Sequence, residues 1–299
     1  MPDVSASPPP MFPVGRLGRS LRPLVGGLLA ALIGLGAVAS PAAGATTWTR
    51  NLWVAEAFLY QDPYSNACTA AATMFMLNTI AYRGTGGPGF AWTPYRIKDN
   101  EDPSDKRDMT SILAFARKHD TLDAEGRGSD PHGWRNALNF HGWGDAAMRD
   151  PSLMPYVDRA YASFDGAVKA AVKAIARRRM PVGLLAWAGR HAYVMTGYAV
   201  TGADPSVSSQ FTVQAVYLSD PLRADDLVNR KVTIDALRSG ASTVRYKPYR
   251  EADSPFDDPY VPEVIPGSIP PSEGPSEWYG RWVVVLPLRP GLPPAAQGS

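Results

Sequence analysis

The chain has 299 residues, of which 45% are hydrophobic and 19% are charged, and this composition excludes a disordered chain. The formal net charge at pH 7 is +2, and the first 45 residues supply all of it because they contain three arginines and one aspartate. The remainder is neutral overall and has no lysine and arginine run long enough to follow a phosphate backbone, which argues against nucleic-acid binding.

Residues 1–45 have the pattern of an export signal. Three arginines precede the apolar run LVGGLLAALIGLGAV at residues 24–38, and small residues follow up to Ala45, after which we expect cleavage. The apolar run is shorter than the roughly 20 residues that span a bilayer, so an uncleaved membrane anchor is the alternative. No cysteine stands immediately after the expected cleavage point, as a lipid anchor would require, and no arginine pair precedes the run, so the sequence predicts ordinary secretion to the extracellular side.

Cys68 is the only cysteine of the chain. In an oxidising compartment an unpaired thiol is either buried and inert, linked to another molecule, or kept for reactivity. Apolar residues spaced three and four apart predict a helix over residues 67–81, with Ser65 or Asn66 as its cap. Cys68 then lies in the first turn, where free N–H groups and the helix dipole favour a thiolate.

Four histidines could serve as the base for such a thiolate. His119 lies in the charged end of a predicted helix, and His132 and His141 flank a second helix in which aromatic and glycine neighbours indicate packing or a wall that faces substrate. The spacing of these histidines, with no second cysteine, matches no compact zinc site, and the sequence predicts no cofactor. The segment at residues 92–103 is predicted to be a loop.

His191 has the most informative surroundings. A buried strand is predicted at residues 180–187, a second strand at residues 191–200 begins with His191, and a third at residues 211–221 ends near Asp220. If the last two form an antiparallel hairpin in which Val200 pairs with Phe211, His191 lies opposite Asp220. A slip of one residue would put the two side chains on opposite faces, so this pairing depends on the register.

A first-turn cysteine, a histidine at a strand start and an acidic residue that ends the next strand form the pattern of a Cys-His-Asp triad. In such a triad the histidine takes the thiol proton and returns it to the leaving amine, while the carboxylate orients the imidazole. The sequence therefore predicts Cys68, His191 and Asp220 as one site.

Three segments resemble secreted bacterial papain-like cysteine peptidases of the bacteriocin-processing, double-glycine leader peptidase type. They are NACTAAATMFMLN, MPVGLLAWAGRHAYVMTGY and VYLSDPL, about 40 residues together. The resemblance implies Cys68 as the nucleophile, His191 as the base, Asp220 as the orienting acid and Gln61 as an oxyanion donor. This chain has Cys-Thr-Ala-Ala where the family usually has Cys-Gly-Pro-Ala, and Gln61 lies one residue further upstream than the family pattern.

The carboxyl-terminal part contains a proline-rich segment at residues 247–281, followed by an apolar run at residues 281–288 that predicts a strand returning to the sheet. We therefore expect one α+β domain over residues 46–288, with a papain-like fold in which the nucleophile helix packs on an antiparallel sheet. Residues 289–299 are expected to be a disordered tail.

The predicted function is a secreted cysteine hydrolase (a thiol protease) that cleaves peptide or other amide bonds. A peptidoglycan amidase or endopeptidase is the enzymatic alternative, and a papain-like surface binding module without catalysis is the alternative from another class. The expected partner is a peptide or a peptidoglycan-like substrate, with no nucleic acid and no stable membrane insertion once the signal is removed.

Overall fold

The computed structural model describes residues 46–121, 128–222, 227–240, 244–249 and 278–288. The predicted signal peptide at residues 1–45, most of the proline-rich segment (residues 250–277) and the predicted tail at residues 289–299 lie outside these ranges. Within the described residues, none of the helices is both long and apolar enough to cross a membrane.

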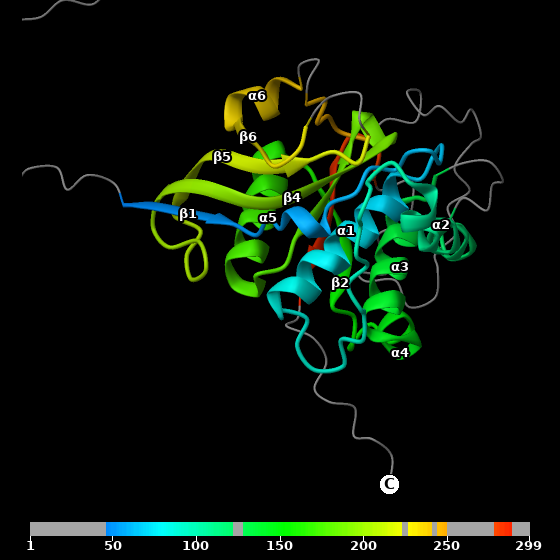
Figure 1. Cartoon of the computed structure of the whole chain (residues 1–299). Coiled ribbons are helices and arrows are strands. Elements are labelled where there is room, and N and C mark those ends of the chain that lie inside the picture. Colours follow the sequence, from blue (N-terminus) through cyan, green and yellow to red (C-terminus); the bar gives the residue numbers. More distant parts are fainter. Residues whose placement is uncertain (1–45, 122–127, 223–226, 241–243, 250–277, 289–299) are drawn as a thin grey trace, which may run out of the picture. The chain divides into compact units, whose positions relative to one another are not determined.

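The described part of the chain is an α+β structure, labelled in Figure 1. Its strands are β1 (Thr47–Asn51), β2 (Tyr156–Tyr161), β3 (Val182–Ala186), β4 (His191–Gly202), β5 (Phe211–Ser219), β6 (Arg230–Thr233) and β7 (Trp282–Pro287). Its α-helices are α1 (Cys68–Arg83), α2 (Asp108–Lys118), α3 (Pro131–Trp143), α4 (Asp145–Arg149), α5 (Phe164–Arg178) and α6 (Ile234–Ser239), with short 3₁₀ turns η1 (Ala55–Ala57), η2 (Pro103–Lys106) and η3 (Trp187–Gly189).

The strands form one sheet in the order β2, β7, β3, β4, β5, β6, and every pairing is antiparallel. The 12-residue strand β4 organises it. One edge of β4 pairs with β3 along residues 191–195 and with β1 along residues 197–201, while β5 covers its other edge. Strand β7 joins the sheet between β2 and β3, which confirms that the apolar run after the proline-rich segment returns to it.

Both faces of the sheet are covered by helices. Because side chains alternate along a strand, Ala192 and Val194 of β4 pack with α1, α2 and α3, whereas Tyr193 and Met195 pack with α5. Figure 1 shows α1, α2 and α3 gathered together and α5 beside the β4–β5 hairpin. Helix α1 is buried along most of its length and packs in the same hydrophobic core as β4. This packing fixes the position of its first residue relative to β4.

The hairpin predicted from the sequence is present, but its register differs from the predicted one. Val200 pairs with Val213, not with Phe211, and Phe211 pairs with Gly202. The register also shifts twice, between Met195 and Gly197 and between Ala199 and Val200. Bulges of this kind cannot be read from a hydrophobic pattern. The offset from the predicted pairing is two residues at Val194 and Met195, near the His191 end, and again from Val200 onward, so these residues keep the parity of their predicted pairing. The offset is three residues from Gly197 to Ala199.

Two further expectations need correction. The cap of α1 is Ala67, with no side-chain hydrogen bond, so neither Ser65 nor Asn66 caps this helix. His132 and His141 do not flank α3 but lie inside it, because Pro131 occupies the first turn and Asp130 accepts a hydrogen bond from the Gly133 N–H as the cap. His119 follows the last residue of α2, as the sequence predicts.

Candidate active site

Cys68 is the first residue of α1. The first intrahelical bond of this turn runs from the Ala71 N–H to the Ala67 carbonyl at 2.8 Å. The N–H groups before that of Ala71 have no helical carbonyl to donate to, because the helix has not yet begun four residues earlier. The cap residue makes no side-chain hydrogen bond to them. The thiol therefore lies beside uncapped backbone donors at the positive end of a 16-residue helix.

His191 and Asp220 form the closest polar contact of the site. Nε2 of His191 lies 2.5 Å from Oδ1 of Asp220, and neither side chain has more than a small exposed fraction. His191 begins β4, and Asp220 directly follows the end of the neighbouring strand β5, so the sheet brings together two residues separated by 29 positions. The predicted contact between His191 and Asp220 is confirmed.

Asp220 is held in place by the backbone around it. Its N–H donates to the Leu227 carbonyl at 2.7 Å, and its Oδ1 accepts a second hydrogen bond, from the Leu222 N–H, at 2.7 Å. Oδ2 is buried and makes no hydrogen bond with a described residue. The carboxylate is thus oriented before it meets the imidazole, which is the task of the acid in a triad.

The electrostatics of His191 connect it to Cys68 as well. Burial disfavours the charged ring, but hydrogen bonds that the ring makes with Asp220 and Cys68, and the negative charge of both partners, raise the pKa of His191 to about 10. Since Nε2 faces Asp220, Nδ1 is the ring nitrogen left to face the thiol. A histidine with this pKa is an imidazolium at neutral pH, and it can stabilise a thiolate.

Exposure decreases along the three residues in the order that the chemistry needs. Cys68 keeps 9% of its surface exposed, His191 keeps 5%, and Asp220 is fully buried. Cys68 is therefore the most exposed of the three residues, while the hydrogen bond between base and acid is protected from water. Exclusion of water strengthens that hydrogen bond relative to the same contact at the surface.

Trp187 is part of this site, and the sequence pattern did not single it out. Its ring lies against His191, with centroids 4.6 Å apart, and the Arg245 guanidinium carbon lies 4.3 Å from its ring centroid. The indole N–H donates to the Tyr193 hydroxyl at 2.8 Å, and the backbone N–H donates to the Arg245 carbonyl at 2.8 Å. These contacts fix the indole ring in place against one side of the His191 imidazole.

The turn that carries Trp187 has an unusual backbone. Trp187 and Ala188 have φ values of 55° and 59°, in the left-handed region that non-glycine residues rarely adopt. Gly189 follows at φ 104°, and a Cβ atom there would lie 2.4 Å from the Tyr249 ring. Strain of this kind concentrates at functional sites. A turn with such restricted geometry directly precedes His191, and its positive φ values could not be read from the letters WAGR.

Gln61 lies close to the acid but is not bonded to the thiol. Its backbone N–H donates to the carbonyl of Pro221, the residue after Asp220, at 2.8 Å. Its side-chain amide donates to the Tyr64 carbonyl at 3.4 Å, while Oε1 is buried without a hydrogen-bond partner among the described residues. The amide is therefore only weakly engaged, and no hydrogen bond joins it to Cys68 within the described chain.

Thr69, the first residue of the unusual sequence after Cys68, is tied to a neighbouring segment. The Ser129 hydroxyl donates to the Thr69 hydroxyl at 2.9 Å, and the Thr69 carbonyl accepts from the Thr73 hydroxyl at 2.8 Å. Thr69 is 3% exposed. Thr69 thus links the first turn of α1 to the segment just before α3, and this contact is a structural reason for a threonine at residue 69.

The other three histidines lie away from Cys68. His132 and Asp158 are fully buried, with Nδ1 and Oδ2 2.8 Å apart, and Arg135 lies 2.9 Å from the other carboxylate oxygen. Burial disfavours the charged ring, yet Asp158 outweighs this effect and raises the pKa of His132. This cluster joins α3 to β2 and is inaccessible to a substrate. His141 packs against Phe115 and Phe140, and His119 also packs against Phe115.

Within the ranges that the structure describes, no group of three or more histidine, cysteine or acidic side chains could hold a metal ion. The geometry therefore brings together Cys68, His191 and Asp220 through one imidazole, with Trp187 beside it and Gln61 near the acid. Comparison with protein-family models, with curated proteins and with solved structures finds no match to this chain.

Proposed function

We propose that this chain is a cysteine hydrolase that cleaves peptide or other amide bonds. Cys68 is the nucleophile, His191 is the general base and acid, and Asp220 orients the imidazole and stabilises its charge. One observation carries the proposal: a single buried imidazole is hydrogen-bonded to the carboxylate of Asp220 and interacts electrostatically with the only cysteine of the chain, and both partners raise its pKa. An inert structural thiol needs neither partner.

The proposed reaction proceeds in two stages. The thiolate of Cys68 attacks the carbonyl carbon of the amide, the C–N bond breaks, and the proton of the His191 imidazolium passes to the leaving amine. The acyl group then remains on sulfur as a thioester. His191, now neutral, takes a proton from water as the water oxygen attacks the thioester carbon. The C–S bond then breaks, the carboxylic acid leaves, and the Cys68 thiolate and His191 imidazolium are restored.

The negative oxygen formed in each stage needs donors. The uncapped N–H groups in the first turn of α1 lie next to the sulfur by covalent connection and are the most direct candidates. Gln61 is the proposed side-chain donor, because its amide is held by a single long hydrogen bond of 3.4 Å and could turn toward the substrate. Its backbone bond to Pro221 keeps it beside the acid.

The same proposal includes a papain-like fold and secretion of the enzyme. A nucleophile at the start of a buried helix and a base at the start of a strand in an antiparallel sheet agree with a papain-like fold. The export pattern in residues 1–45 supports a secreted enzyme. A chain with only one cysteine cannot form an intramolecular disulfide, so its thiol can stay free in an oxidising compartment.

A library screen tests the proposed function. Wild-type protein and the Cys68→Ala variant are incubated with peptide libraries and with muropeptides, and the products are read by mass spectrometry. We expect cleavage of amide bonds by the wild type and none by Cys68→Ala, while Asp204→Asn, a carboxylate outside the site, cleaves like the wild type. Cleavage confined to muropeptides would assign a cell-wall enzyme, and no cleavage with a slowly reacting thiol would favour a binding module.

A further inference from the structure

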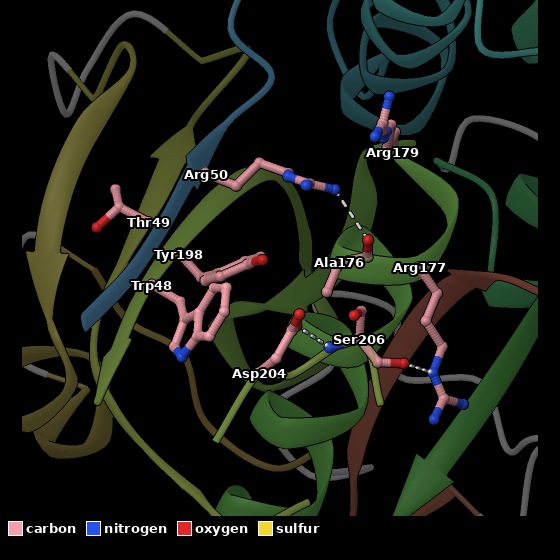
Figure 2. Close-up of a pocket in the computed structure, with 9 residues that line it drawn as sticks. All are labelled: Trp48, Thr49, Arg50, Ala176, Arg177, Arg179, Tyr198, Asp204 and Ser206. Atoms are coloured by element: carbon pink, nitrogen blue, oxygen red, sulfur yellow. Dashed lines mark hydrogen bonds between the residues drawn. The ribbon is translucent and has the colours of Figure 1, made fainter. Parts of the chain in front are cut away.

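A cavity lies away from Cys68, between β1, the end of α5, β4 and the segment after β4. It has a volume of about 400 Å³ and is lined by Trp48, Thr49, Arg50, Ala176, Arg177, Arg179, Tyr198, Asp204 and Ser206 (Figure 2). Tyr198 follows His191 by seven positions on β4, which corresponds to about 20 Å along a strand. The cavity is therefore separate from the proposed active site.

The charge of this cavity is positive. Three guanidinium groups and one carboxylate line it, which leaves an excess of two positive charges. The carboxylate of Asp204 is already engaged, because its Oδ1 accepts a hydrogen bond from the Ser206 N–H at 2.8 Å. The chain outside residues 1–45 is neutral overall, so this is a local concentration of positive charge and not a consequence of a basic protein.

Two of the arginines are held in position by the backbone. Nη1 of Arg50 donates to the Ala176 carbonyl at 2.8 Å, which Figure 2 shows as a link between β1 and the last turn of α5. Nε of Arg177 donates to the Ser206 carbonyl at 2.7 Å. Each guanidinium uses one N–H group in this way and keeps others for a ligand. Donors that are fixed before binding lose less entropy on binding.

Arg179 differs from the other two. It ends α5 in the left-handed conformation, with φ 56°, and is exposed at the rim of the cavity. Its guanidinium makes no hydrogen bond or ion pair with a described residue. An arginine that lines a cavity but contributes no contact inside the described chain is available to a ligand.

Aromatic side chains supply the rest of the wall. Trp48 is 37% exposed, with its indole N–H fixed to the Gly202 carbonyl at 3.0 Å, so its ring position is set. Tyr198 is 4% exposed, and its hydroxyl makes no hydrogen bond with a described residue. The cavity therefore offers a neutral donor and an aromatic surface beside the guanidinium groups.

We propose that this cavity binds a phosphate monoester, with the phosphate between the arginines and its organic group against Trp48 and Tyr198. A phosphate monoester carries close to two negative charges at neutral pH, which matches the excess charge of the lining. The forked donors of arginine fit phosphate oxygens. The cavity is several times larger than a phosphate ion, so an attached group has room. This site is independent of the hydrolase chemistry.

Calorimetric titration at constant ionic strength tests the proposal with three probes: inorganic phosphate, phenyl phosphate and benzoate. We expect both phosphates to bind, phenyl phosphate more tightly because its ring reaches the aromatic wall, and benzoate to bind at least tenfold more weakly than phenyl phosphate because it carries one charge. Cys68→Ala is expected to bind phenyl phosphate like the wild type, which separates this site from the proposed active site.

The decisive comparison uses two exposed arginines. Arg179→Gln removes a guanidinium from the cavity, and Arg230→Gln removes one from β6, outside the cavity. We expect Arg179→Gln to weaken phenyl phosphate binding about tenfold and Arg230→Gln to leave it unchanged. Arg177→Gln, in the last turn of α5, gives a second test and is expected to weaken phenyl phosphate binding as well. Absence of phosphate binding to the wild type, or equal effects of Arg179→Gln and Arg230→Gln, would overturn the proposal.

Discussion

Nε2 of His191 lies 2.5 Å from Oδ1 of Asp220, at the point where β4 begins and β5 has just ended. An asparagine at residue 220 keeps an oxygen for the imidazole N–H and for the Leu222 N–H, but it removes the negative charge that stabilises the imidazolium. We therefore expect Asp220→Asn to lower the rate of hydrolysis of a substrate found in the library screen by about 10²–10⁴-fold, measured as kcat/KM.

The matched control for Asp220→Asn is Asp204→Asn, which neutralises an aspartate that accepts from the Ser206 N–H far from Cys68. It is expected to keep the wild-type kcat/KM. Equal activity of Asp220→Asn and the wild type would show that the buried carboxylate only fills space.

The raised pKa of His191 predicts a pH dependence of stability. The ring has a pKa of about 10 in the folded chain and about 6.5 when unfolded, so the folded state binds the proton more tightly. The stabilisation that follows is fully present below pH 6.5 and is lost as the pH rises toward 10. The difference in free energy of unfolding between wild type and His191→Gln should shrink over this range, as measured by urea unfolding at pH 6, 8 and 10.

Groups that do not interact with His191 affect wild type and His191→Gln alike, so the difference reports on the imidazole together with its partners Cys68 and Asp220. A difference that stays constant from pH 6 to pH 10 would mean that His191 is neutral in the folded chain. Cys68 and Asp220 would then not stabilise a protonated His191 imidazole.

Trp187 is expected to act as a positioning residue for His191. Trp187→Ala removes the ring that lies 4.6 Å from the imidazole, and it should cost about 2 kcal/mol of stability because the side chain is only half-buried. It should also slow alkylation of Cys68 in folded protein, whereas Trp187→Phe should restore the alkylation rate. Trp48→Ala, on β1 where it pairs with the far end of β4, is the matched tryptophan control and should leave alkylation unchanged.

The buried pair of His132 and Asp158 is expected to affect stability but not the reactivity of Cys68. Both side chains are fully buried, and Arg135 completes the cluster. Asp158→Asn leaves the buried Arg135 guanidinium without its counter-charge and should cost about 3 kcal/mol in urea unfolding at pH 7. Folded Asp158→Asn should nevertheless alkylate at the wild-type rate, and a slower rate would mean that this cluster also serves Cys68.

Much of the fold could be predicted because hydrophobic periodicity sets it directly. The helix with Cys68 in its first turn, the strand that starts at His191 and the returning strand β7 all follow from apolar spacing. The register of β4 and β5 could not be predicted, since the shifts after Met195 and Ala199 are irregularities of strand pairing that leave no mark on the hydrophobic pattern. The contact between His191 and Asp220 was nonetheless predicted, because a two-residue offset preserves the face.

The parts of the site that sequence reasoning missed depend on contacts between distant segments. Trp187 follows a strand pattern and gives no sign that its backbone turns to φ 55° against His191. The bond between Thr69 and Ser129 joins residues 60 positions apart. The missing side-chain cap of α1 was equally unpredictable, since Ser65 and Asn66 are typical capping residues.

The central claim is that His191 activates Cys68. The most direct measurement is the rate of alkylation of native Cys68 by iodoacetamide at pH 6 to 7, compared between wild type, His191→Ala and the control His132→Ala, with folding checked by circular dichroism. We predict rapid alkylation in the wild type and in folded His132→Ala, and a rate at least tenfold lower in His191→Ala. A thiol that reacts only after unfolding, or at the same rate with and without His191, would contradict the claim.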